Sequence, residues 1–173
     1  MDRAQVVKRA YRALADCGLD HPPFDPRRVA ENYGAVVIGQ EADDSESGFC
    51  LRSGGRTLIG VNSNHRPHRQ RFTISHEVGH LLLHEGRSLT VDKSVRVSYR
   101  NDISSMATDS EEIEANAFAA ALLMPQDHVR AAASPLVKSQ RSEREIISRL
   151  AKKFDVSSQA MTFRLVNLGI LLG

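Results

Sequence analysis

Apolar residues along the first part of the chain recur at spacings that predict two helices. Between residues 2 and 17 they fall on one face of an amphipathic helix, with arginines and lysines elsewhere. A proline-rich stretch follows, in which Asp25 precedes Pro26 as an N-cap precedes the first residue of a helix. We therefore expect a short second helix that runs through Asn32.

The next apolar runs are short and rich in β-branched residues, as is typical of strands. Residues 35–39 form one such run, and residues 47–51 and 56–61 flank a turn that contains Gly54-Gly55. Two strand-like runs around a glycine-containing turn predict a β-hairpin. A further strand is expected within residues 89–100.

Helical spacing returns in two stretches that carry titratable residues. Residues 75–84 read SHEVGHLLLH and place three histidines four positions apart. After a polar loop at residues 101–110, a second helix is expected from about Ser110 to Met124, where Pro125 ends it. Because the histidine helix is otherwise largely apolar, we expect it to be buried, and burying imidazoles and a carboxylate without partners would be costly.

Composition limits the classes of protein that these elements can form. The 173 residues suffice for one domain, or for one domain with a small appendage. Hydrophobic residues make up 41% and charged residues 25%, as in a soluble globular protein, and the net charge of +2 is too small to indicate nucleic-acid or membrane binding. No apolar run suits a signal peptide or a membrane span, and Cys17 and Cys50 belong to no Cys-x-x-Cys pair. We therefore expect a cytoplasmic protein with two reduced thiols and no membrane partner.

His76-Glu77-x-x-His80 has the pattern of a helix that binds zinc. Side chains four residues apart lie one above the other on a helix, so His76 and His80 can reach the same ion. Glu77 lies about 100° around the helix from His76, where its carboxylate can take a proton from a water that zinc activates. The pattern predicts one zinc ion and Glu77 as the catalytic base, although it also occurs by chance in helices that bind no metal.

His84 continues the histidine series but fits the metal less well. On an unbroken helix it lies about 12 Å along the axis from His76 and about 80° around it, so these two histidines cannot share an ion. His80 and His84 could share one, but Glu77 would then stand before the ligand pair. We expect His84 to hydrogen-bond to a zinc ligand or to contact the helix end, or else simply to pack in the core.

The second helix offers three carboxylates for the missing zinc ligand. Glu112 shares a helix face with Asn116 and Ala119. That face combines a ligand, a polar residue that can orient an imidazole, and a small residue that lets helices approach closely. Glu114 has apolar neighbours on its face, and Glu111 suits the dipole at the start of the helix. The grouping therefore favours Glu112 over Glu114.

The two helices together resemble the ImmA/IrrE family of bacterial and phage metallopeptidases. The likeness is strongest over residues 69–125, with H-E-x-G-H-x-x-x-H, a glutamate four residues before an asparagine, and F-A-A-x-L-L-M-P. The resemblance implies zinc ligands at His76, His80 and Glu112, a catalytic base at Glu77, and a residue that supports a ligand at Asn116. It also implies an α+β fold with a gluzincin-like core, in which a small antiparallel sheet packs on the zinc helix and the glutamate-bearing helix.

The resemblance implies a function as well. Members of the family cleave helix-turn-helix repressors, often encoded by the neighbouring gene, and so release mobile-element or stress-response genes. The alternative is a non-catalytic regulator or antitoxin-like binding module that contacts DNA or a protein partner. For an enzyme, an oxyanion would need nearby donors. The candidates are Tyr99, Arg100, His65 and His68.

The C-terminal part of the chain differs in character, so we expect a metallopeptidase domain at residues 1–133 and a helical segment packed on it at residues 134–173. Residues 138–164 carry seven Lys or Arg and three Asp or Glu. Ile147, Leu150 and Ala151 are expected to face inward on one helix, and Ser157 to cap a second after a turn at Asp155, which predicts a helix-turn-helix.

Two interpretations of this segment remain open. If it binds DNA, the second helix would enter the major groove with four exposed residues: Ser158, Gln159, Thr162 and Arg164. The interpretation we favour is a helical hairpin that completes the core or docks the substrate, because this shape often serves packing.

Overall fold

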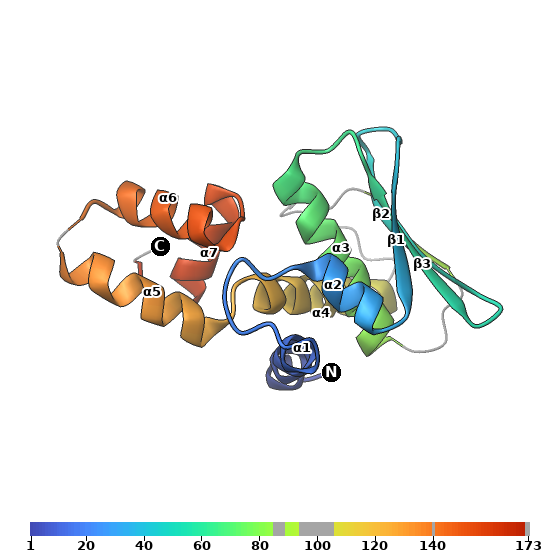
Figure 1. Cartoon of the computed structure of the whole chain (residues 1–173), viewed down its shortest axis with the longest axis horizontal. Coiled ribbons are helices and arrows are strands. Elements are labelled where there is room, and N and C mark those ends of the chain that lie inside the picture. Colours follow the sequence, from blue (N-terminus) through green and yellow to red (C-terminus); the bar gives the residue numbers. More distant parts are fainter. Residues whose placement is uncertain (85–88, 94–105, 140, 172–173) are drawn as a thin grey trace.

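The protein is described by a computed structural model that covers residues 1–84, 89–93, 106–139 and 141–171 (Figure 1). Within those ranges the chain forms an α+β fold of seven helices and four strands. In chain order they are α1 (Arg3–Asp16), α2 (Pro26–Asn32), β1 (Ala35–Gln40), β2 (Glu46–Ser53), β3 (Arg56–Asn62), α3 (Pro67–Leu83), β4 (Leu89–Lys93), α4 (Met106–Leu123), α5 (Gln126–Lys138), α6 (Glu143–Phe154) and α7 (Ser158–Asn167).

Capping side chains set where several helices begin, as the sequence predicted. The carboxylate of Asp25 accepts a hydrogen bond from the Arg27 amide at 3.0 Å, which starts α2. The hydroxyl of Ser157 accepts one from the Ala160 amide at 3.1 Å, which starts α7. These bonds satisfy amides that have no partner within the helix.

The four strands form a mixed sheet in the order β1-β3-β2-β4, so the expected antiparallel sheet is wrong. β2 and β3 are the predicted antiparallel hairpin, and β4 pairs antiparallel with β2. β1 instead pairs parallel with β3, from Ala35 beside Thr57 to Gln40 beside Asn62. The four consecutive buried residues at the end of β3 suit a place between two other strands. Because the chain reverses direction between β1 and β2 and again between β2 and β3, β1 then runs parallel to β3.

Helices cover one face of this sheet, and α3 lies directly against it (Figure 1). α4 crosses α3 on the side away from the strands, while α1 packs on α4 and α2 packs on α3 and β1. α4 begins at Met106, four residues before the expected start, so part of the expected loop is helical. The remainder of that loop, and residues 94–100 of the expected strand, lie outside the described residues.

The last three helices form one end of the molecule, on the left in Figure 1. α6 and α7 are joined at Asp155, whose φ of 54° is left-handed, a conformation that aspartate tolerates better than most residues. Ile146, Leu150 and Phe154 bury the inner face of α6, whereas Ile147, expected inside, is only half-buried. The spacing of four residues explains this, because it places Ile146 rather than Ile147 on the stripe that faces the core.

This end of the molecule is fastened to the zinc-motif helix by polar contacts. Arg71 of α3 donates to the carbonyl of Asp155 and pairs with its carboxylate, each at 3.1 Å, and also donates to the Phe24 carbonyl at 2.7 Å. His68 of α3 contacts the same carboxylate at 3.1 Å. The division expected between residues 133 and 134 stays a prediction, and α5 runs across that position. None of the helices within the described ranges is long and apolar enough to span a membrane.

Candidate metal centre

Three side chains from α3 and α4 bring their ligand atoms together. Nε2 of His76 lies 3.0 Å from Nε2 of His80. The carboxylate of Glu112 approaches both, with one oxygen 3.1 Å from His76 and the other 3.2 Å from His80. These are the two histidines and the glutamate that the sequence singled out. They form a group that could hold a metal ion.

The spacing of these atoms suits a small tetrahedral ion. A metal bound at about 2.0–2.1 Å by tetrahedral ligands separates those ligands by roughly 3.3 Å. The two Nε2 atoms are 3.0 Å apart, and Glu112 places one oxygen 3.1 Å from His76 and its other oxygen 3.2 Å from His80. One ligand atom from each residue lies within 4.8 Å of the others, which is compact enough for such an ion. Two imidazole nitrogens and a carboxylate oxygen are also the donor types of three-ligand zinc sites that leave a fourth position open for chemistry.

Burial and charge are unequal across the site. The side chains of His76 and His80 are 1% and 3% exposed, whereas that of Glu112 is 42% exposed. Burial raises the pKa of Glu112, but hydrogen bonds from His76 and His80 lower it by more than burial raises it. The resulting pKa of Glu112 is well below the ordinary value. The carboxylate is therefore ionised at neutral pH, as a metal ligand must be.

Each histidine ligand is held from behind by another side chain. Nδ1 of His76 lies 3.1 Å from the amide oxygen of Asn116, as the facial grouping on the second helix suggested. Nδ1 of His80 lies 3.1 Å from Nδ1 of His84, just beyond the end of α3. His84 in turn contacts Glu114 at 3.0 Å through Nε2. The sequence disfavoured Glu114 as a ligand because its helix face is apolar, and nothing local in the sequence indicates that α4 brings it to His84.

A close helix crossing places Glu112 over the histidines. A Cβ added to Gly79 of α3 would lie 3.1 Å from the Cα and 3.2 Å from the carbonyl oxygen of Ala115 in α4. Both distances are tighter than ordinary packing, so only glycine lets the two backbones approach this closely. Glu112 and Asn116 stand on either side of Ala115 along α4. The crossing therefore sets the distance from both residues to His76 and His80.

Glu77 is completely buried beside strand β2. A Cβ added to Gly48 would lie 3.7 Å from a carboxylate oxygen of Glu77, and only 2.5 Å from the Thr73 methyl group and 2.7 Å from the Gly60 carbonyl. Cys50, two residues along β2, also faces Glu77: burial first, and then the Glu77 charge, raise the pKa of its thiol. The strand thus approaches the zinc-motif helix closely where the expected base lies.

Arg52, also on β2, reaches the last turn of α3. Its guanidinium donates to the His80 carbonyl at 2.8 Å and to the His84 carbonyl at 3.1 Å. The His80 carbonyl also accepts from the His84 amide at 3.2 Å, and a positive charge at the C-terminal end of a helix is favoured by the helix dipole. β2 therefore supports the backbone of one expected metal ligand. No motif in the sequence pointed to this residue.

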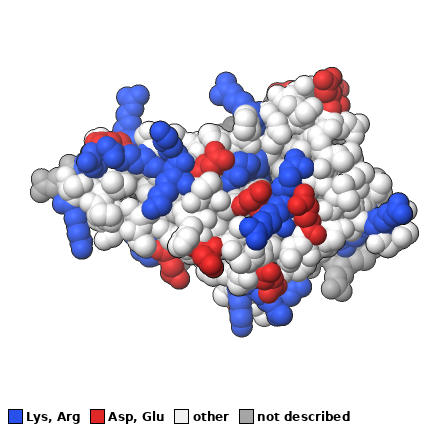
Figure 2. Space-filling model, viewed as in Figure 1, with Lys and Arg blue, Asp and Glu red and all other residues white. Residues whose placement is uncertain are grey.

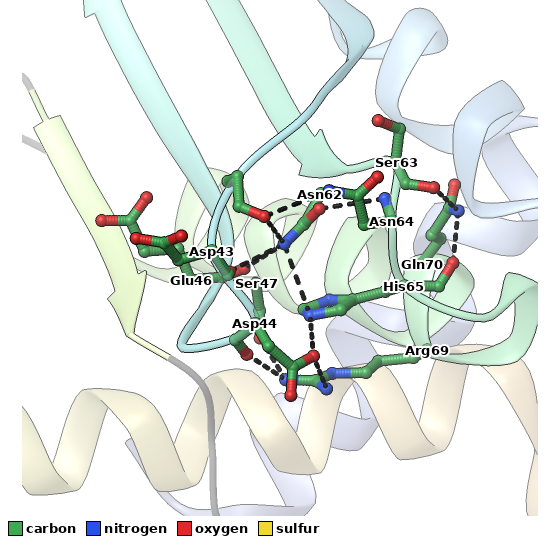
Figure 3. A network of polar contacts seen from close by, with 11 residues as sticks. Asp43, Asp44, Glu46, Ser47, Asn62, Ser63, Asn64, His65, Arg69 and Gln70 are labelled. Atoms are coloured by element: carbon green, nitrogen blue, oxygen red, sulfur yellow. Dashed lines mark hydrogen bonds and ion pairs between the residues drawn. The ribbon is translucent and has the colours of Figure 1, made fainter.

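Two of the expected oxyanion donors are engaged in other contacts. Figure 3 shows His65 within a polar network, where its Nε2 lies 3.1 Å from Asp44 and 3.4 Å from the Asn62 amide nitrogen. That amide nitrogen also lies 2.9–3.1 Å from the carbonyls of Ala42, Asp43 and Glu46, and Arg69 contacts Asp44 and Ser47. His68 pairs with Asp155. Tyr99 and Arg100 lie outside the described residues.

The residues expected on the outer face of α7 divide into two groups. Ser158 and Gln159 are exposed, and Thr162 is half-buried, with its hydroxyl donating to the Ser158 carbonyl at 2.9 Å. Arg164 was expected to be exposed and is instead buried, with Nε donating to the Met124 carbonyl at 2.9 Å. The reason is helix geometry, because residues 161, 164 and 165 share one face and all three are buried.

Comparison with known proteins places this geometry in a family. The model of a peptidase family described as the IrrE N-terminal-like domain matches residues 30–166, which include both helices of the candidate site. The chain belongs to this family. Among the IrrE-like proteins it is similar to radiation response metalloprotease IrrE of Deinococcus deserti, at 32% identity over 153 residues, and to that of Deinococcus radiodurans, at 31% over 108 residues.

These likenesses cover only part of each relative. The alignments take in 80% of this chain and 51% of the Deinococcus deserti protein, and 62% and 30% in the Deinococcus radiodurans comparison. A Mycobacterium tuberculosis transcriptional regulator shares the fold, with a TM-score of 0.64 at 18% identity over 94% of this chain and 46% of that one. The chain thus spans about half the length of the curated relative it covers best. Membership of an IrrE-like metalloprotease family and the His-His-Glu group together support a metal cofactor.

Proposed function

We propose that the protein is a zinc-dependent endopeptidase with one zinc ion bound by His76, His80 and Glu112. The observation that carries the proposal is that the Glu112 carboxylate of α4 meets Nε2 of His76 and of His80, with contacts of 3.0–3.2 Å, beside Glu77 on α3. Metalloprotease relatives support the reaction class. A structural zinc site would fit less well, because such sites use four protein ligands and have no need of a neighbouring base.

The roles of the side chains follow from their chemistry. Zinc, when bound, would supply a Lewis acid that polarises a carbonyl group and lowers the pKa of water. Glu77 would take the proton from the attacking water and pass it to the leaving amine. Asn116 and His84 would keep the two imidazoles oriented toward the metal. In this proposal the helices and the sheet form a gluzincin-like core, and the protein acts in the cytoplasm.

We further propose that the substrate is a helix-turn-helix transcriptional repressor encoded near this chain, so that cleavage releases mobile-element or stress-response genes. The ImmA/IrrE resemblance of residues 69–125 supports this substrate class, as does membership of a peptidase family whose substrates are proteins. The structural relative from Mycobacterium tuberculosis carries the description transcriptional regulator, which is consistent with a role in gene control.

The decisive experiment mixes the purified protein with the repressor encoded by the neighbouring gene, with and without a metal chelator. Glu77→Gln is compared with Glu31→Gln, which changes an exposed glutamate on α2. Removing a general base costs about 10²–10⁴-fold in rate. Mass spectrometry of the fragments should therefore show cleavage by the wild type and Glu31→Gln, and a loss of at least 100-fold in Glu77→Gln and with chelator.

Other outcomes separate the alternatives. Full cleavage by Glu77→Gln, or purified protein without zinc, would refute the enzyme proposal. A stable complex with the repressor, with zinc bound but no cleavage by the wild type, would instead support the non-catalytic regulator.

The C-terminal helices fit substrate docking better than DNA binding. Figure 2 shows Lys and Arg side chains over the end formed by α5 and α6, interspersed with acidic ones. Arg141 and Arg149 both pair with Glu145, and Arg164 is buried, which reduces the free positive charge. Phe163 is 50% exposed on α7 beside the exposed residues at its start. An exposed aromatic side chain suits a protein partner.

This proposal is tested by two measurements on the full chain. A gel shift with random-sequence DNA over a salt series should show no binding even at low salt, because three of the seven Lys and Arg at residues 138–164 are paired with Glu145 or buried, and so are less available for phosphate contacts. Phe163→Ala should weaken repressor binding, whereas Val36→Ala, which trims an exposed side chain on β1, should not. Salt-sensitive DNA binding together with unchanged repressor affinity in Phe163→Ala would favour the DNA interpretation.

A further inference from the structure

A continuous line of polar contacts runs from α4 to one of the proposed zinc ligands. Oε2 of Glu114 lies 3.0 Å from Nε2 of His84. Nδ1 of His84 lies 3.1 Å from Nδ1 of His80, and Nε2 of His80 faces Glu112 at 3.2 Å. Glu114 is two residues from Glu112 on α4, yet it contacts the metal group only through two imidazole rings.

The few hydrogens on these side chains determine which atom donates at each contact along the line. A neutral imidazole has one N–H and one acceptor nitrogen, and an ionised carboxylate only accepts. Glu114 therefore requires the N–H of His84 to be on Nε2, which leaves Nδ1 of His84 as an acceptor. With zinc bound, Glu112 would ligate the ion rather than accept from His80. Nδ1 of His80 would then carry the hydrogen, and its Nε2 would present a lone pair to the metal. The opposite arrangement would set a lone pair of His84 against the carboxylate and an N–H of His80 against the metal.

We infer that Glu114 and His84 are positioning residues that select the metal-binding tautomer of His80. This inference rests on the proposed function of His76, His80 and Glu112 as zinc ligands. It assigns a role to Glu114 that neither the motif nor the metal group contains. Metal-bound histidines depend on such partners for orientation, and losing them typically costs 10–100-fold in metal affinity.

The other ligand lacks a comparable selector. His76 is backed by the Asn116 side chain, and an amide offers either an oxygen or an NH₂ group by rotating half a turn. Asn116 can therefore pair with either tautomer of His76, whereas Glu114 can pair with only one of His84. Burial sharpens the difference, because His80 is 2% and His84 9% exposed, so water competes little for these nitrogens. Arg52 also fixes the backbone carbonyls of both histidines.

The test uses the full chain, first stripped of metal, and four variants of this line of contacts: Glu114→Ala, Glu114→Gln, His84→Ala and His84→Gln. Glu31→Gln again serves as the matched control. Because Glu114 also pairs with the amino group of Met1, the two His84 variants are needed, since they leave that pair in place. Circular dichroism establishes which variants fold before any comparison is made.

Zinc affinity is measured by competition with a chromophoric chelator. We expect both alanine variants to bind zinc about 10–100-fold more weakly, and the control to match the wild type. His84→Gln should recover much of the loss, because its amide can accept from His80 and donate to Glu114. Glu114→Gln should fall between wild type and Glu114→Ala, because an amide can present either group to His84.

The second readout is the tautomer itself, which a merely structural role would not change. In the metal-free wild type, Glu112 also faces Nε2 of His80 and would compete for the hydrogen, so the measurement uses a Glu112→Ala background. Nitrogen-15 NMR of labelled histidines at about pH 8, where ordinary histidines are neutral, should show His80 protonated on Nδ1 in Glu112→Ala. Adding Glu114→Ala should give a mixture of tautomers.

Wild-type zinc affinity in Glu114→Ala, with the His80 tautomer unchanged, would overturn the inference and leave the peptidase proposal intact. Tight zinc binding with the expected losses in the variants, but no cleavage of repressor by the wild type, would confirm the positioning role of Glu114 and His84 and refute the peptidase proposal.

Discussion

Gly79→Ala tests whether the helix crossing controls the metal centre. In an isolated helix this change would stabilise the protein, because alanine is favoured over glycine by about 0.8–1 kcal/mol. Here the new methyl group would lie 3.1 Å from the Cα and 3.2 Å from the carbonyl oxygen of Ala115. Carbon atoms pack best at about 3.5–4.0 Å, so α3 and α4 must separate by roughly 0.5 Å.

Two consequences of this separation can be given a size. Overpacking of this kind costs about 1–3 kcal/mol, which exceeds the helix gain, so the free energy of unfolding should fall by about 0–2 kcal/mol. The contacts from Glu112 and Asn116 to the histidines, now 3.1–3.2 Å, would lengthen beyond ordinary hydrogen-bond range. We expect zinc affinity to fall by about tenfold, the lower end of the cost of losing a ligand's supporting contact.

Urea unfolding and chelator competition measure the two effects, with Gly39→Ala as the control. A Cβ at Gly39 would lie 3.6 Å from its nearest neighbour, an ordinary contact, so that variant should keep wild-type zinc affinity. Adding Ala115→Gly to Gly79→Ala should restore little, because the two closest contacts are with the Ala115 backbone. A Gly79→Ala protein that is more stable than wild type and binds zinc equally well would refute this account of the crossing.

Three further contacts are tested by urea unfolding of variants. Tyr33 is half-buried, and its hydroxyl donates to Asp16; burial and that hydrogen bond raise the pKa of Tyr33 to about 12. The stability of wild type relative to Tyr33→Phe should therefore be constant below pH 10 and decline as pH rises toward about 12. A difference that does not change with pH would contradict this. Arg52→Met should destabilise by about 1–3 kcal/mol through lost charged hydrogen bonds to the end of α3, and exposed Arg56→Met should cost little. Asp155→Ala should be about 1 kcal/mol less stable than Asp155→Gly. Both variants lose the ion pairs with α3, but only glycine adopts a φ of 54° without strain. Equal stabilities would argue against strain at this position.

The residues of the metal group could be predicted because their arrangement is local. Helix geometry alone aligns His76 with His80, and the facial grouping of Glu112 with Asn116 depends only on the spacing within α4. Both histidine spacing and glutamate choice agree with the atoms that converge in the structure. The capping residues Asp25 and Ser157 were predictable for the same reason, because a cap contacts amides two or three residues away.

What could not be predicted depends on contacts between distant segments. Parallel pairing of β1 with β3 leaves no mark on either strand, since it is decided by which strand buries best in the whole sheet. The partnership of Glu114 with His84 requires α3 to end at Leu83 and α4 to cross it at Gly79. The burial of Arg164 was in principle readable, because the apolar residues of α7 mark its face, but the charge suggested solvent.

Asn62, at the end of β3, ties the pairing of the sheet to the loop that precedes β2. Its buried amide nitrogen contacts three backbone carbonyls of residues 42–46, while its backbone pairs with Gln40 of β1. If β3 slipped by one residue, this side chain would turn to the opposite face of the sheet. The loop carbonyls would then lose their donor, and each hydrogen bond lost costs about 0.5–1.5 kcal/mol net. The contacts of Asn62 therefore link closure of the loop to the alignment of β3 in the sheet.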